Sequence, residues 1–182
     1  MVIYSDASEQ GWGAKCGEDR AHGRWTEEDL SPFNINFLEI MAAKFAILAF
    51  GKSTSPCHIR IMSDNQTTVS HINHQGGHRS PPCNRVSREI WQWAEDRNIW
   101  ISAAHIPGVE NIDAVEQSRE FDDATEWSIP DGIFHDLTDI WGIPDIDLFA
   151  TRINTKLKDY VSWHPDITAS QLMHFLSYGH TN

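Results

Sequence analysis

The pattern of apolar and polar positions changes its period several times along the chain, and each change predicts a new element. Residues 1–26 alternate and are divided by glycines, which predicts an antiparallel meander of three strands. Residues 36–50 repeat apolar side chains every three or four positions, as an amphipathic helix does. The same patterns predict a strand over 58–62, a helix to 72, a helix over 84–97, a strand over 99–104 and a short helix over 109–119.

This order of strands and helices, βββαβααβα, predicts an α/β domain over residues 1–120, with a mixed five-stranded sheet flanked by helices. Residues 121–182 form an acidic, Trp-containing C-terminal extension with a single convincing amphipathic segment, around 133–141. We expect the extension to pack on the main domain or to stay partly loose, because its large apolar side chains are too few for a separate core. They are Trp127, Trp141, Leu148, Phe149 and Trp163.

Composition narrows the class of protein. A chain of 182 residues with 40% hydrophobic side chains can bury the core of one ordinary domain. No apolar run approaches the roughly 20 residues of a membrane span, and no basic-then-apolar leader opens the chain, so we expect an intracellular protein, cytoplasmic or nuclear, with no membrane partner. The cysteines, Cys16, Cys57 and Cys83, are isolated thiols, which argues against a zinc site.

Three carboxylates stand where predicted elements end or begin. Asp6 follows the first apolar strand, Glu39 lies in the first turn of the first helix, and Asp64 follows the strand over 58–62. Because such positions meet at one edge of a sheet, we expect the three side chains to lie within reach of one metal site. Hard divalent cations such as Mg²⁺ prefer oxygen ligands of this kind.

Each of these residues also has a purely structural interpretation. Asp6 would also suit a turn, and Glu39 would suit a capping box as the reciprocal partner of Asn36. Asp64 is a good N-cap for the helix that follows it. These alternatives do not predict the order in which the three carboxylates occur.

Several short motifs together resemble the ribonuclease H domain of retroelement reverse transcriptases, above all that of DIRS-type retrotransposons, which encode a tyrosine recombinase. They are Tyr4–Ser8, Asn36–Glu39, Ser63–Thr67, Ile72–Gly77 and His105–Asn111. Glu126–Ser128 and Trp141–Arg152 are similar to the segment that follows this domain in those polyproteins. The resemblance implies a ribonuclease H-like fold and a metal-dependent endonuclease that hydrolyses the RNA strand of RNA–DNA hybrids.

The resemblance also implies a cofactor and its ligands. Two Mg²⁺ or Mn²⁺ ions are expected, with Asp6 bridging both and with Glu39 and Asp64 holding the ion on the leaving-group side. The fourth carboxylate is expected ten residues after His105, where this chain has Val115. On a helix, Asp113 points nearly opposite to position 115, whereas Glu116 is turned by about 100°, so Glu116 is the better substitute ligand.

The histidines leave two alternatives open. By resemblance, His105 assists turnover from a mobile loop, but the sequence around it also suits the end of the last strand, with the ring near the site as a structural or phosphate-contacting group. His71, His74 and His78 surround Gly76 and Gly77 at spacings that suit no tight ligand set, which favours a solvated loop.

Contacts with nucleic acid are expected from two groups of residues. Asn65 and Gln66 suit the substrate backbone or the 2′-hydroxyls that distinguish RNA from DNA, and helix capping is their alternative role. Arg79, Arg85 and Arg88 form a candidate phosphate-gripping ridge, or else a solvated face. Trp91, Trp93 and Trp100 are better explained as core. The net charge of −12 predicts weak binding that is lost readily as salt rises.

These observations favour a retroelement-derived ribonuclease H-type nuclease, impaired by Val115, whose partners are an RNA–DNA hybrid or other nucleic acid and a reverse transcriptase domain of the parent polyprotein. Two alternatives remain. One is a catalytically silent module that binds nucleic acid or a protein, and the other is a related nuclease acting on DNA.

Overall fold

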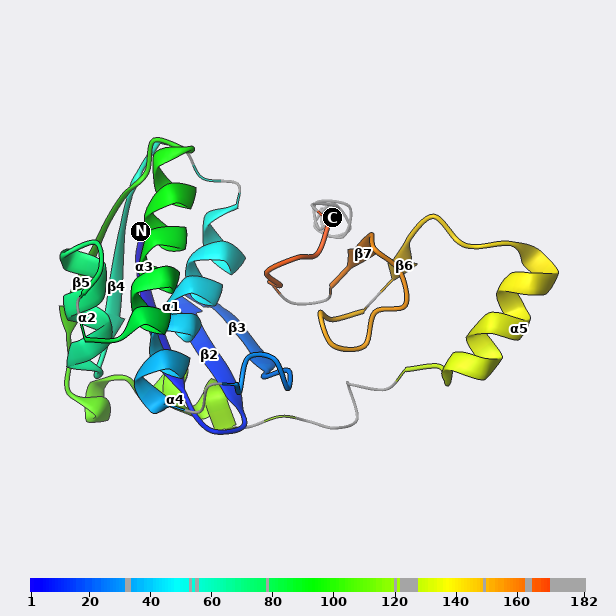
Figure 1. The fold of residues 1–182 in the computed structure, drawn as a ribbon, viewed down its shortest axis with the longest axis horizontal. Coiled ribbons are helices and arrows are strands. Elements are labelled where there is room, and N and C mark those ends of the chain that lie inside the picture. The colour runs from blue at the N-terminus through cyan, green and yellow to red at the C-terminus, as the bar shows by residue number, and fades with distance from the viewer. Residues whose placement is uncertain are drawn as a thin grey trace, which may run out of the picture. The chain divides into compact units, whose positions relative to one another are not determined.

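The structure is a computed structural model that describes residues 1–31, 34–52, 54, 56–77, 79–119, 121, 128–148, 150–162 and 165–170. The chain divides into two compact units, Met1–Phe121 and Asp122–Asn182 (Figure 1). Across the described ranges, no helix has both the length and the apolar character needed to cross a membrane.

The first unit is built on a five-stranded mixed sheet with the spatial order β3-β2-β1-β4-β5. The first three strands pair antiparallel as a meander, while β4 runs parallel to both β1 and β5. Buried isoleucines, Ile3, Ile59, Ile61 and Ile101, line the centre of the sheet. The strands are β1 (Val2–Ala7), β2 (Gly11–Cys16), β3 (Asp19–Arg24), β4 (His58–Ser63) and β5 (Trp100–His105).

Helices cover both faces of this sheet. Trp12 and Gly13 are neighbours on β2 and therefore face opposite sides; the ring of Trp12 contacts Phe45 of α1, whereas Gly13 lies against the backbone of α4. The helices of the unit are α1 (Ile35–Gly51), α2 (Gln66–Asn73), α3 (Pro81–Glu95), the 3-10 turn η1 (Gly108–Glu110) and α4 (Ile112–Arg119). The predicted element order and fold class are confirmed.

The start of α1 differs from the prediction. Asn34, not Asn36, is the N-cap, and its side chain accepts a hydrogen bond from the Asn36 amide at 2.9 Å. Glu39 consequently lies in the second turn, outside any capping box. The helix ends at Gly51, within one residue of the predicted end, with Lys52 as the C-cap.

The starts of the next two helices differ as well. Asn65 caps α2 by accepting from the Thr68 amide at 2.9 Å, so Asp64 is not the cap and its carboxylate is left for another role. Helix α3 begins at Pro81, three residues earlier than expected, with Ser80 as its cap. Prolines suit the first helical positions because the amides there have no intrahelical partner.

The second unit is smaller and is described by itself. It contains α5 (Asp131–Trp141), which covers the predicted amphipathic segment, and a parallel pair of two-residue strands, β6 (Asp147–Leu148) and β7 (Tyr160–Val161). The buried side chains in the described part of this unit include Ala150, Tyr160, Val161 and Ile167. Trp127, Phe149 and Trp163 lie outside the described residues, and packing of the extension on the first unit stays a prediction.

Candidate metal centre

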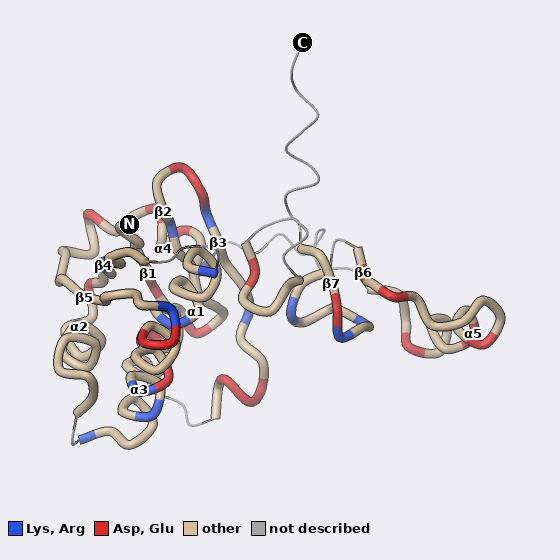
Figure 2. The backbone as a smooth tube through the Cα atoms, turned by 90° about the horizontal axis from the view of Figure 1, so that it is seen from above, with Lys and Arg blue, Asp and Glu red and all other residues tan. Residues whose placement is uncertain are grey.

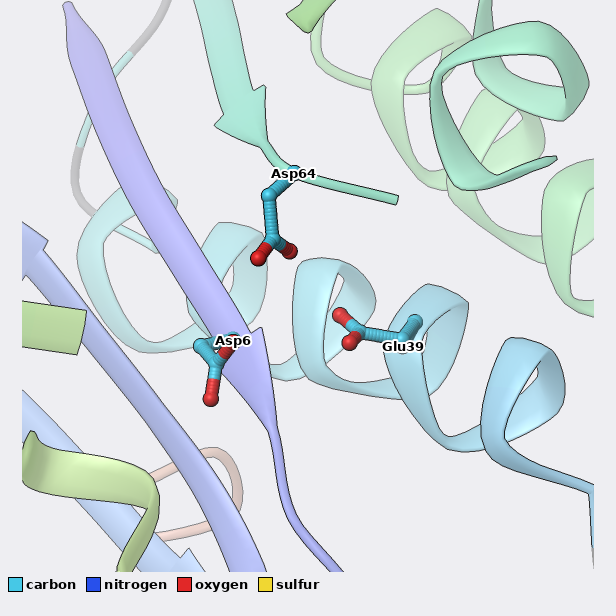
Figure 3. Close-up of side chains that lie close together, drawn as sticks. All are labelled: Asp6, Glu39 and Asp64. Atoms are coloured by element: carbon cyan, nitrogen blue, oxygen red, sulfur yellow. The ribbon is translucent and has the colours of Figure 1, made fainter. Parts of the chain in front are cut away.

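Three carboxylates from separate elements meet at one end of the sheet (Figure 3). Asp6 lies near the end of β1, Glu39 lies in α1, and Asp64 directly follows β4. One carboxylate oxygen from each lies within 4.8 Å of those of the other two. The topology explains this meeting, because β1 and β4 are parallel neighbours whose carboxyl ends share one edge, and α1 packs against β1.

Because this cluster is buried, keeping its carboxylates ionised costs free energy unless a cation binds them. Asp6 and Glu39 are only 4% and 6% exposed, and Glu39 Oε2 has no hydrogen-bond partner. Burial, followed by the nearby charges of Asp6 and Asp64, raises the pKa of Glu39 to about 9, although the Ala7 amide opposes this by donating a hydrogen bond. Burial also raises the pKa of Asp6. An unpartnered buried carboxylate oxygen beside two more carboxylates fits a divalent cation.

The helix expected to carry the fourth ligand offers no carboxylate to this cluster. Val115 lies in α4, and Glu116, the expected substitute, is exposed and is not brought into the group of three. Asp113 is held elsewhere, because Lys15 and Arg20 of the β2–β3 hairpin bind its two oxygens at 2.5 and 2.8 Å. These ion pairs lower the pKa of Asp113. Among the described residues, the metal-binding group therefore consists of Asp6, Glu39 and Asp64.

His105 is the last residue of β5, as one of the two alternatives predicts. Its Nε2 lies 3.0 Å from the backbone oxygen of Asp64. Because a carbonyl only accepts hydrogen bonds, Nε2 must carry a proton in this contact. His105 thus ties the end of β5 to the segment that bears Asp64.

The other histidines do not form a metal site within the described chain. His71 is buried beneath Gly77, its Nδ1 has no hydrogen-bond partner, and burial lowers its pKa. His74 lies at the exposed end of α2, where its ring contacts the Ser70 carbonyl. His78 lies outside the described residues.

Two of the residues expected to contact nucleic acid, Asn65 and Gln66, lie at the start of α2, directly after Asp64. The side chain of Asn65 has a structural role. Its Oδ1 caps α2, and its Nδ2 donates a hydrogen bond to Asn36 Oδ1 at 2.9 Å. Gln66 and Arg79 are exposed and line a groove of about 550 Å³ between α1, α2 and α3, which also includes Asn36.

The remaining two arginines lie on α3, which carries both basic and acidic positions (Figure 2). Arg85 is 3.9 Å from Glu89, and Glu89 also binds Lys44, while Arg88 is exposed. Glu89 therefore partly neutralises the basic surface expected from these arginines.

One polar partner of the cluster was not predicted. Ser118 of α4 is fully buried, and its hydroxyl lies 2.6 Å from Asp6 Oδ2. In the sequence, Ser118 is a polar residue near the end of the predicted short helix, and nothing in the pattern around it indicates what the serine contacts.

Comparison with known proteins identifies the fold. No family model and no curated protein matches the chain. Solved structures of ribonucleases H do match, among them two with a TM-score of 0.51. LC11-RNase H1 in complex with an RNA/DNA hybrid is 18% identical, with 64% of this chain and 91% of that chain covered and a TM-score of 0.51. The N-terminal RNase H domain of rv2228c from Mycobacterium tuberculosis, a fusion with maltose binding protein, is 16% identical, with 68% and 93% covered and a TM-score of 0.51. The first unit has a ribonuclease H-like fold.

Proposed function

We propose that this chain is a divalent-cation-dependent nuclease of the ribonuclease H type, which hydrolyses the RNA strand of RNA–DNA hybrids with reduced efficiency. The observation that carries the proposal is the convergence of Asp6, Glu39 and Asp64 within 4.8 Å on a ribonuclease H-like fold. A similar fold in complex with an RNA/DNA hybrid, LC11-RNase H1, supports the choice of substrate.

The chemistry of phosphodiester hydrolysis suits this donor set. Bound Mg²⁺ or Mn²⁺ ions supply a water of lowered pKa and charge stabilisation for the leaving oxygen. Asp6, Glu39 and Asp64 are the residues that would hold these ions. His105 keeps the Asp64 segment in place, and the groove lined by Gln66 and Arg79 offers amide and guanidinium donors to a strand backbone.

Val115 is the reason to expect reduced efficiency. A valine cannot hold an ion, and neither Asp113 nor Glu116 replaces the missing carboxylate in the described structure. Mg²⁺ demands near-ideal octahedral geometry, so it should suffer more from the lost ligand than a more permissive ion. The same observation favours a second candidate function, a module that binds nucleic acid in the presence of cations without cleaving it.

The test is cleavage of a labelled RNA–DNA hybrid with Mg²⁺ or Mn²⁺, with duplex RNA and duplex DNA as comparison substrates. We expect weak or absent cleavage with Mg²⁺, partial rescue by Mn²⁺, and a gain on Val115→Asp. Partners of metal ligands alone are worth about 10- to 100-fold in affinity or activity, so a restored ligand should give at least about 10-fold. Val109→Asp is the matched control, because Val109 is 78% exposed in η1.

Each outcome separates the candidate functions. Fast cleavage by the native chain in Mg²⁺, unchanged by Val115→Asp, would show that position 115 is not a ligand position. Hybrid binding without cleavage, even after Val115→Asp, would support the silent module. Preference for duplex DNA would support a DNA nuclease.

The motif order also leads us to infer descent from a DIRS-type retrotransposon polyprotein, in which a reverse transcriptase domain would be the partner. The net charge of −12 implies that this chain alone binds a hybrid weakly and loses it readily as salt rises. Hybrid binding measured between low and physiological salt, with and without that partner, tests both statements. Equal, salt-insensitive binding in the two cases would contradict them.

A further inference from the structure

Ser118 lies between the last helix of the first unit and the central carboxylate of the cluster. Its hydroxyl oxygen is 2.6 Å from Asp6 Oδ2 and 2.9 Å from the Val115 carbonyl oxygen, and the residue is fully buried. A hydroxyl has a single proton to donate. Toward an ionised Asp6, that proton makes a charge-assisted hydrogen bond, which is stronger than one to a neutral carbonyl.

The helix that carries Ser118 is held firmly against β1 and β2. A Cβ at Gly13 would come within 2.4 Å of both the Ala114 oxygen and the Ser118 nitrogen, so only glycine permits this approach. Ser8 donates its hydroxyl to the Ser118 carbonyl at 2.5 Å, and buried Asn111 donates to the Ser5 carbonyl at 3.0 Å. The position of the hydroxyl is thus fixed from both ends of α4.

This geometry changes what α4 contributes to the cluster. One turn before Ser118, at position 115, the helix lacks the carboxylate that would hold an ion. At position 118 it presents instead a hydroxyl that touches a carboxylate. With Oδ2 accepting from Ser118, the Asp6 carboxylate has a fixed rotation, and Oδ1 keeps all its lone pairs for a cation.

We propose that Ser118 is a positioning residue for cation binding, which orients Asp6 in a site that is one carboxylate short. The proposal rests on the metal site proposed above. Because Asp6 is the ligand expected to bridge both ions, an Asp6 side chain that rotates freely would weaken cation binding before any chemistry takes place. Hydrogen-bonded partners of metal ligands typically contribute about 10- to 100-fold to metal affinity.

The experiment is calorimetric titration of the full chain with MnCl₂, and then with MgCl₂, without nucleic acid. Ser118→Ala should weaken Mn²⁺ binding by at least about 10-fold, and Ser118→Thr, which retains the hydroxyl, should regain most of the affinity. Ser87→Ala is the matched control. Ser87 is also a fully buried helical serine, and it donates to the His71 carbonyl at 2.8 Å, away from the carboxylates.

The proposal fails if Ser118→Ala binds Mn²⁺ within about twofold of the native affinity, or if Ser87→Ala loses as much as Ser118→Ala. Either result leaves the metal site itself intact. Absence of any Mn²⁺ binding by the native chain would instead overturn the proposed function together with this inference. Should Ser118→Ala not fold, Ser118→Thr and Ser118→Val give the same comparison, because they match in shape and differ in the hydroxyl.

Discussion

Replacing Glu39 by glutamine should stabilise the cation-free protein, and the structure indicates by how much. Glu39 is 6% exposed, one of its oxygens has no hydrogen-bond partner, and two further carboxylates lie within 4.8 Å. Glutamine has nearly the same shape but carries no charge. Its amide can donate to the neighbouring carboxylates, so the substitution removes repulsion without opening a cavity.

The magnitude follows from the pKa of Glu39, which rises from 4.5 to about 9 on folding. Between these two values the folded chain holds a proton that the unfolded chain has released, so stability falls as the pH rises through this window. At about pH 7.5, which is about 3 pH units above the unfolded pKa of 4.5, the native chain has lost at most about 4 kcal/mol of stability through ionisation of Glu39. This is the expected stability advantage of Glu39→Gln at that pH. The difference should vanish near pH 4, where the side chain is protonated in both states.

The assay is urea unfolding of the native chain and Glu39→Gln from pH 4 to pH 8 in the presence of EDTA. Glu39→Gln should be the more stable protein at pH 8 and equal to the native chain at pH 4. Mn²⁺ should stabilise the native chain by mass action and stabilise the variant less. Glu116→Gln is the control for charge alone, because Glu116 is exposed on α4.

A Glu39→Gln protein that is no more stable than the native chain at pH 8 would refute this reasoning. It would mean that Glu39 is solvated or already paired with a cation that resists EDTA. An equal gain from Glu116→Gln would indicate relief of the overall negative charge, and not of the cluster.

Three further predictions concern other parts of the molecule. Asp6→Asn should abolish hybrid cleavage and leave the fold intact or more stable, as judged by activity and thermal unfolding; retained cleavage would point to another site or a contaminant. Asp113→Asn should leave Mn²⁺ affinity unchanged, because Lys15 and Arg20 hold Asp113 away from the cluster; a marked loss in titration would contradict this. Residues 122–182 should show hydrogen exchange slower than a free coil in the full chain, and coil-like exchange throughout would exclude docking.

The meeting of the three carboxylates could be predicted because the topology brings the ends of β1 and β4 and the N-terminal half of α1 to one edge of the sheet. The exact first residues of the helices were harder to predict from the sequence. Asn34 and Asn36 are both good N-caps two residues apart, and only the extended backbone of Asn34 decides between them. The same ambiguity affected Asp64 and Asn65, of which Asn65 is the N-cap of α2.

Contacts between distant segments could not be predicted from spacing. Asp113 appeared near the missing ligand in sequence, yet the hairpin that binds it lies more than 90 residues earlier in the chain. Ser118 and Asp6 are 112 residues apart, and their hydrogen bond depends on how closely α4 approaches β2 at Gly13. Neither the charge pattern nor the helical period of the sequence indicates how closely these two elements approach each other.

The central position of β1 has a consequence for the order of folding. Its antiparallel partner β2 is close in sequence and can pair early, whereas its parallel partner β4 begins more than 50 residues later. Nonlocal parallel pairing forms slowly, so we expect Asp64 to meet Asp6 in a late step of folding. If the carboxylates meet after the rate-limiting barrier, a bound cation will slow unfolding while leaving the rate of refolding nearly unchanged. The lifetime of the native state, more than the speed of reaching it, would then follow the supply of divalent ions.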